Sequence, residues 1–199
     1  MSRGLGDVYK RQHFALHPEG EIISGKMRLD LWNAEATTDI VTTKGAIHLK
    51  TFVHADNMIM IVKATTEGEE KDFQWEWIAA EANSPRYLFF KNQDKMDKIP
   101  QDYQLNPAAE ISQKNDINLS TQKLLAGGET VVGWQESKAE KGERILWINL
   151  THTYPQTNAG EICMKEIKKA GRQGFKKLQS THRCLLYTSP SPRDMRRSR

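Results

Sequence analysis

Histidines and carboxylates are the side chains of this sequence that could do metal or acid–base chemistry, and their spacing argues against both. None of the six histidines stands at a zinc-binding spacing from another or beside a cysteine. His48 and His54 share one face of an expected strand but lie about 20 Å apart at strand rise, too far to share a metal. We therefore expect surface or edge histidines, and neither a metal nor a cofactor is predicted.

The acidic side chains form a run rather than a pair. They fall together in an expected hairpin turn, where solvated charge is far more common than general acid–base catalysis, and are Glu67, Glu69, Glu70 and Asp72. A glycosidase needs two carboxylates about 5 to 10 Å apart across a sugar, and the sequence nominates no such pair. No catalytic residue is predicted.

Three side chains are candidates for contact with a sugar. Trp75 and Trp77 alternate with Phe73 on one face of an expected strand and could stack on a carbohydrate, although such alternation is more typical of core packing. Arg86 enters a long polar segment and is a candidate for an exposed polar contact, with a structural role as its alternative. Trp75, Trp77 and Arg86 are thus the sugar-contact candidates.

The elements that must position these residues are mostly strands. From residue 13 to residue 157, turn residues recur every eight to twelve positions among β-branched and aromatic residues, which predicts an antiparallel β-sandwich. The first strands are expected to form a meander, and residues 87–109 a long polar loop with one short strand. The expected strands are 27–33, 36–42, 45–54, 58–64, 72–80, 118–125, 130–136 and 144–153. From Asn158, a suitable helix N-cap, the apolar period becomes helical. The expected fold is mainly β, with a C-terminal helical segment at 158–183.

The two ends of the chain are related at the level of DNA. Residues 2–12, SRGLGDVYKRQ, can be encoded by a sequence that resembles a transposase sequencing-library adapter. The opposite strand of that DNA, read in another frame, encodes residues 184–194, CLLYTSPSPRD. We therefore expect residues 1–12 and 184–199 to be adapter-derived and non-native. A native basic tail after a Pro-Ser linker is the alternative.

Removing these ends changes the charge of the chain. They carry seven basic and two acidic side chains, so the formal net charge of +4 becomes −1 over residues 13–183, with 22 basic and 23 acidic side chains. A nucleic acid or an anionic membrane is therefore not an expected partner. No apolar run approaches the roughly 18 residues that cross a bilayer, and Cys163 is the one cysteine left.

Several strand patterns resemble a known family. The stretches 27–40 (MRLDLWNAEATTDI), 45–65 (GAIHLKTFVHADNMIMIVKAT) and 75–86 (WEWIAAEANSPR) resemble the N-terminal β-domain of glycoside hydrolases related to families ninety-five and sixty-five. The resemblance continues through 124–137 and 145–155 and ends at 174–183, which is similar to the start of the linker helix that leads to the catalytic barrel. It covers nearly all of residues 13–183, but it lies in strand patterns rather than catalytic signatures.

The resemblance implies a supersandwich-like β-domain, incomplete on its N-terminal side, and an (α/α)₆ barrel that carries the acid and base residues. The implied partners are a carbohydrate and this barrel, which the chain lacks. The implied activity of the whole protein is that of an inverting glycosidase, for α-L-fucosides or another plant or algal sugar, while this fragment is expected to be inactive. The alternative is a stand-alone carbohydrate-binding or adhesive β-sandwich that uses Trp75 and Trp77.

Overall fold

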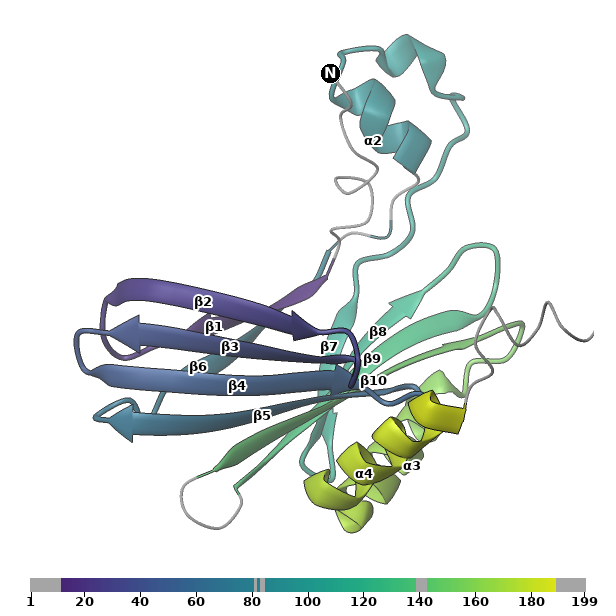
Figure 1. Cartoon of the computed structure of the whole chain (residues 1–199). Helices are drawn as coiled ribbons and strands as arrows, with labels where there is room; N and C mark the ends of the chain where they lie inside the picture. Colours follow the sequence, from purple (N-terminus) through teal and green to yellow (C-terminus); the bar gives the residue numbers. More distant parts are fainter. Residues whose placement is uncertain (1–11, 81, 83–84, 139–142, 189–199) are drawn as a thin grey trace, which may run out of the picture.

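The computed structural model describes residues 12–80, 82, 85–138 and 143–188, and its fold is mainly β (Figure 1). A large antiparallel sheet has eight strands in the order β2-β3-β4-β5-β10-β9-β8-β7, and a small sheet pairs β1 with β6. The strands are β1 His13–His17, β2 Ile22–Asp30, β3 Glu35–Thr42, β4 Gly45–Val53, β5 Ile59–Gly68, β6 Gln74–Ile78, β7 Glu110–Lys114, β8 Ile117–Lys123, β9 Glu129–Lys138 and β10 Arg144–Thr153. The helices are α2 Pro85–Lys91, the short 3₁₀ turn η1 Met96–Lys98, α3 Ala159–Gln173 and α4 Phe175–Thr188.

Two meanders make the large sheet. One runs from β2 to β5 and the other from β7 to β10, each by pairing of consecutive strands. They join where β10 pairs antiparallel with β5, with Trp147 opposite Ile61 and Leu146 opposite Val62. Because side chains alternate along a strand, this register places Trp147 and Ile61 on one face of the sheet and Leu146 and Val62 on the other.

The helices α3 and α4 cover one face of the large sheet (Figure 1). The buried residues of α3 recur at helical spacing and contact the sheet; they are Ala159, Cys163, Ile167 and Ala170. Gly133 of β9 lies directly beneath, and a Cβ at this position would come within 2.4 Å of the Cys163 sulfur. The absence of a side chain at Gly133 is therefore what lets α3 approach the sheet so closely.

The small sheet packs on the opposite face. Phe14 pairs with Trp77 and Leu16 with Trp75, so one face of this ribbon is aromatic and aliphatic. These side chains pack against buried residues of the large sheet, which are Ile47, Val62, Ala64, Val132, Leu146 and Ile148. The molecule thus has three layers, helical, large sheet and small sheet, and each side of the large sheet carries its own core.

Most of the expected elements are confirmed. The antiparallel β fold with a C-terminal helical segment is as predicted, β10 has the expected bounds, and α3 begins directly after Asn158. The side chain of Asn158 makes no capping hydrogen bond, however. The amide of Ala159 instead donates to the carboxylate of Glu129, at 2.9 Å between nitrogen and oxygen. A side chain from the sheet thus caps this helix.

Two sequence predictions were wrong in detail, and two strands, β1 and β7, were not expected. The meander does not continue through residues 72–80, because β6 leaves the large sheet to pair with β1. The expected loop 87–109 contains η1 and most of α2, a helix of seven residues that is too short to show an apolar period and begins at Pro85, a residue favoured in the first helical turn. Strand β7 was not expected, because all five of its residues are exposed and show no alternation.

The ends of the chain are described only in part. The helix α4 continues past Arg183, where the expected helical segment ends, to Thr188. Residues 1–11 and 189–199, most of the expected adapter-derived ends, lie outside the described residues, as do 139–142 in the expected turn before β10. Among the helices described, none combines the length and the apolar character needed to span a bilayer.

Candidate functional site

An apolar depression lies beside the small sheet, and we call it the apolar groove. It encloses about 580 Å³. Its walls come from both sheets: Gln12, His13, Phe14, Leu49, Thr51, Val53, Met58, Met60, Val62, Trp75, Trp77, Val132, Leu146, Ile148 and Leu150. Three of these side chains are largely bare, with exposed fractions of 68% for Met58, 56% for Val53 and 48% for Leu150. Contiguous exposed apolar side chains are a common feature of binding surfaces.

Both candidate tryptophans line the apolar groove. The Trp77 ring packs against Phe14 and Trp134 with centroids 4.8 and 5.5 Å apart, and the Trp75 ring meets Phe73 edge to face at 5.4 Å. These are the contacts of core packing, the interpretation that the alternation favours. The indole Nε1 groups of Trp75 and Trp77 are nevertheless buried without a hydrogen-bond partner among the described residues. Contact of either residue with a sugar stays a prediction.

Arg86 lies elsewhere in the molecule. It belongs to α2, which projects away from both sheets (Figure 1), and its guanidinium carbon lies 5.5 Å from the centroid of the Phe90 ring. Nearby, Tyr87 and Tyr103 stack with centroids 5.2 Å apart. The structure therefore brings Trp75 and Trp77 together but does not bring Arg86 to them.

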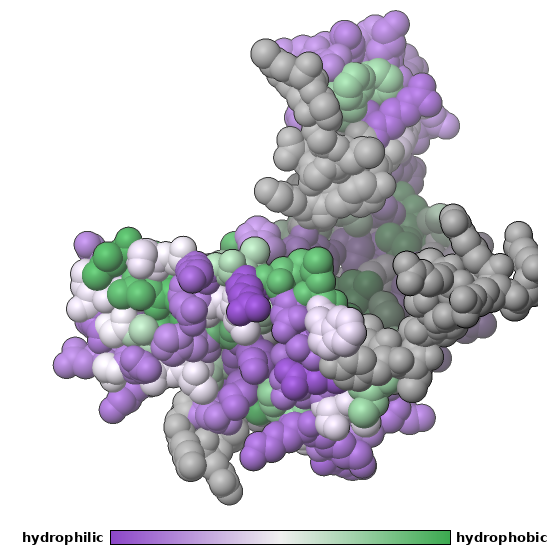
Figure 2. Space-filling view, viewed as in Figure 1, coloured by the Kyte–Doolittle hydropathy of each residue, from purple (hydrophilic) through white to green (hydrophobic). Residues whose placement is uncertain are grey.

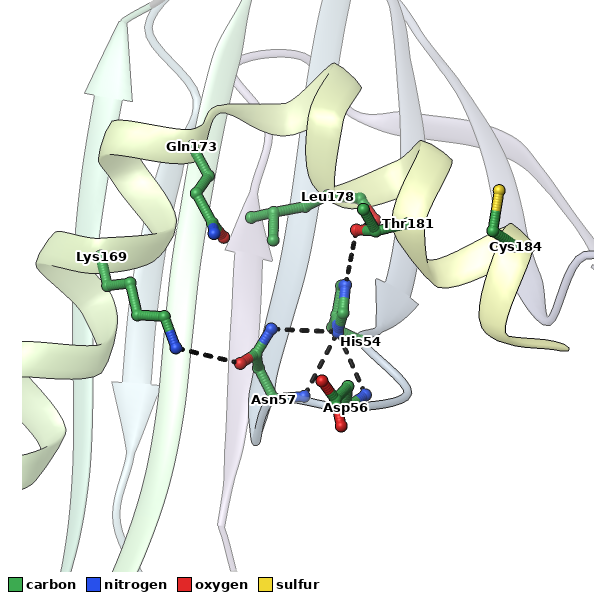
Figure 3. Close-up of a pocket in the computed structure, with 8 residues that line it drawn as sticks. All are labelled: His54, Asp56, Asn57, Lys169, Gln173, Leu178, Thr181 and Cys184. Atoms are coloured by element: carbon green, nitrogen blue, oxygen red, sulfur yellow. Dashed lines mark hydrogen bonds between the residues drawn. The ribbon is translucent and has the colours of Figure 1, made fainter. Parts of the chain in front are cut away.

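A second cavity lies between α4 and the turn that joins β4 to β5, and we call it the α4 pocket (Figure 3). It encloses about 480 Å³. The Nε2 of His54 lies 3.0 Å from the Thr181 hydroxyl, and its Nδ1 accepts hydrogen bonds from the amides of Asp56 and Asn57 at 3.1 and 3.2 Å. Since Nδ1 is an acceptor, His54 is neutral with its proton on Nε2. Burial lowers the pKa of His54, with smaller contributions in the same direction from the neighbouring His182 and Lys169 and an opposing effect of Asp56.

His182 anchors α4 in the same way. It is 2% exposed and stacks on Phe52 with ring centroids 5.0 Å apart. Its Nδ1 accepts from the Ala55 amide at 3.2 Å, and its Nε2 donates to the Asn33 carbonyl at 3.1 Å. Both ring nitrogens are occupied, as they are in His54, so neither histidine is free to act as a base.

The expectation of surface or edge histidines is wrong for His54 and His182. His54 is 5% exposed, and its side chain points to the face of the large sheet that α4 covers. The contact between them joins segments more than a hundred residues apart, and nothing in the local sequence around either one signals it. His48 is closer to expectation, since it remains part-exposed and pairs with Asp39 on the neighbouring strand at 2.7 Å.

The solvated-charge interpretation is wrong for one member of the acidic run. Glu70 is fully buried, and its carboxylate accepts hydrogen bonds from the amides of Glu19 and Gly20 at 2.8 and 2.7 Å and from the Thr42 hydroxyl at 2.5 Å. Burial by itself would raise the pKa of Glu70, but these three bonds and the nearby charge of Lys44 outweigh it and hold the pKa below its ordinary value. This carboxylate ties together three connections, β1–β2, β3–β4 and β5–β6.

The linings of both cavities are poor in carboxylates. Among the described residues, the lining of the apolar groove holds no carboxylate, and that of the α4 pocket holds one, Asp56. Glycoside hydrolysis uses two carboxyl groups. No cluster of three or more His, Cys, Asp or Glu side chains in the described part of the chain could hold a metal ion.

No protein-family model matches this chain, and no curated protein matches it.

Proposed function

We propose that this chain is a non-catalytic β-domain of a glycoside hydrolase related to families ninety-five and sixty-five, whose role is to carry and orient a helical catalytic barrel. The observation that carries this proposal is that the buried ionisable side chains make structural hydrogen bonds. Glu70 holds three connections, His54 and His182 hold α4, and Glu129 caps α3. Side chains committed to such contacts build a rigid support rather than a reactive centre.

The C-terminal helix supports the same proposal. Glu35 at the start of β3 is 3% exposed, and it accepts two hydrogen bonds from Arg183 at 2.6 and 2.9 Å and two from Gln179. The pKa of Glu35 lies below its ordinary value because these bonds and the Arg183 charge outweigh its burial. An Arg–carboxylate fork of this kind fixes the direction in which α4 leaves the sheet. A helix that leads into a catalytic barrel needs a fixed direction.

A stand-alone carbohydrate-binding or adhesive β-sandwich is the second candidate. The observation that favours it is that Trp75 and Trp77 line the apolar groove and that their buried indole N–H groups have no hydrogen-bond partner among the described residues. An indole N–H can donate to a sugar hydroxyl, but here the rings must first shift to expose it. Against it, the aromatic contacts of Trp77 with Phe14 and Trp134 occupy ring surface that a sugar would need for stacking.

The deciding experiment extends the reading frame. The genomic DNA around the coding sequence of residues 13–183 is recovered and expressed as one protein, and hydrolysis of aryl α-L-fucosides and related aryl glycosides is measured beside the 199-residue chain. We expect turnover by the extended protein and none by the 199-residue chain. A stop codon directly after Arg183, or turnover by the 199-residue chain alone, would overturn the proposal.

A glycan array tests the second candidate. Saturable binding of an oligosaccharide by the 199-residue chain, weakened in Trp77→Phe, would favour the carbohydrate-binding module. This substitution keeps an aromatic ring in the packing position and removes the N–H donor together with one ring of the indole. We expect no such binding.

A further inference from the structure

The apolar groove continues an interface that already exists within the molecule. From Val62 of β5 back to Met58, in the turn before this strand, the exposed fraction rises from 6% at Val62 to 37% at Met60 and 68% at Met58. The facing residues of β10 follow the same course, from 1% at Leu146 through 9% at Ile148 to 48% at Leu150. One end of this apolar surface is covered by the small sheet and the other end is bare. The bare end is the floor of the apolar groove.

The small sheet stops short of this floor. It holds two strands in the part of the chain that the structure describes, so the outer edge of β1 faces no other described strand. His13 alternates with the inward-facing Phe14, yet both line the apolar groove together with Gln12. From β6, only the inward-facing Trp75 and Trp77 line it. The groove therefore lies beside the first residues of β1, at an edge that no other described strand pairs with.

Two-stranded ribbons and unpaired strand edges are both stabilised by an additional strand. A ribbon of two strands is marginally stable in water until a third strand or another layer supports it. The unpaired edge presents backbone N–H and C=O groups that accept an added strand, and side chains that alternate along that strand fill apolar positions on one side. An added strand lies about 4.8 Å from its neighbour, which places it beside β1 and over the groove floor.

We infer that the apolar groove seats a third strand of the small sheet, donated by another polypeptide segment, which pairs with the outer edge of β1. Its alternate side chains are apolar and cover Val53, Met58 and Met60, whereas those between them are polar and face water. The main-chain bonds to β1 supply the register, and the burial of groove side chains supplies most of the affinity. This inference concerns the sheet alone and does not rest on the glycosidase proposal.

The test adds a strand-forming probe to the full chain. The probe is a synthetic peptide of alternating residues, KTVTVTVTK, which contains no tryptophan, so that Trp75 and Trp77 report its arrival by fluorescence. We expect saturable binding, a blue shift of the emission, and slower hydrogen exchange of the β1 amides, His13–His17. A second peptide of the same sequence, N-methylated at backbone nitrogens along both edges, cannot donate main-chain hydrogen bonds to β1 from either edge and should bind at least tenfold more weakly.

Two variants locate the binding site. Met58→Lys places a charge on the groove floor at a side chain that is 68% exposed, so it should fold normally and lose peptide binding at least tenfold. Ile22→Lys is the matched control, since Ile22 is 61% exposed on β2 and lies outside the groove lining. It should bind the peptide as the unmodified chain does, and thermal melts of both variants should match that of the unmodified chain.

Three outcomes would overturn the inference. No binding of KTVTVTVTK would do so, and so would equal binding of the N-methylated peptide, which would mean that the groove takes apolar side chains without strand pairing. The third is a concentration-dependent dimer of the unmodified chain that Met58→Lys abolishes. That result would make a second copy of this chain the occupant in place of a donated strand.

Discussion

Replacing Glu70 by glutamine tests whether a buried carboxylate holds the connections between the two sheets. Glutamine has the same shape, but its amide nitrogen must face either the Glu19 amide or the donors Gly20 and Thr42. At least one charge-assisted hydrogen bond is then lost, worth about 1.5 to 3 kcal/mol, and a buried N–H is left without an acceptor. We expect the free energy of unfolding to fall by about 3 kcal/mol. For a chain of this size, that lowers the melting temperature by about 6 to 12 °C.

The assay is thermal unfolding followed by circular dichroism, with Glu69→Gln as the matched control. Glu69 is the exposed neighbour of Glu70, and its substitution should change stability by no more than about 0.5 kcal/mol. Because the pKa of Glu70 in the fold lies below its ordinary value of 4.5, its contribution is complete above that value and is lost as pH falls through the folded pKa. The difference between the unmodified chain and Glu70→Gln should therefore shrink in acid. Equal melting temperatures for the two variants at neutral pH would refute the reasoning.

Three further predictions concern the helical layer. The pKa of His54 in the fold is lowered from 6.5, so the neutral form of His54 stabilises the fold above that value. This stabilisation is lost as the pH falls through the folded pKa. Hydrogen exchange should therefore show α4 opening in acid before α3 does. Gly133→Ala should lower the free energy of unfolding by about 1 to 3 kcal/mol, because the added Cβ would lie 2.4 Å from the Cys163 sulfur. Gly171→Ala should leave stability unchanged or raise it, because an added Cβ there has nothing within 4 Å. Urea unfolding measures both. A thiol reagent at neutral pH should modify the exposed Cys184 and leave Cys163 unreacted until denaturant is added, because burial raises the pKa of Cys163 to about 12. Rapid labelling of Cys163 in the folded chain would contradict the packing of α3.

The alternation of side chains predicted the strands wherever a strand is covered by one layer on each side. In β10, Leu146 and Ile148 face the small sheet while Ile145 and Trp147 face the helices, and this division can be read directly from the sequence. Alternation failed for β7, which has no buried residue. A strand held only by backbone pairing to its neighbour leaves no trace in the pattern of apolar residues.

The functional residues were harder to predict because their partners lie far away in the chain. The sequence marked Trp75 and Trp77 as a pair, and the structure places both on the apolar groove. It could not mark Glu70, since the amides of Glu19 and Gly20 that bury it lie about fifty residues upstream and have no side-chain signature. Backbone donors are invisible to any argument from residue types.

The pairing of β5 with β10 bears on how the chain is made. The partners in this pairing, from Ala64 with Arg144 to Ile59 with Asn149, are 80 to 90 residues apart, so β5 can pair along its second edge only after the ribosome has released β10. Until then, β5 has an open edge and an apolar sequence, IMIVKA, with no acidic residue and no proline. Such a segment on a nascent chain is prone to pair with the same segment of another nascent chain nearby. Yield in expression should therefore depend on chaperones that hold β5 during the synthesis of β7 to β10, more than on the stability of the finished fold.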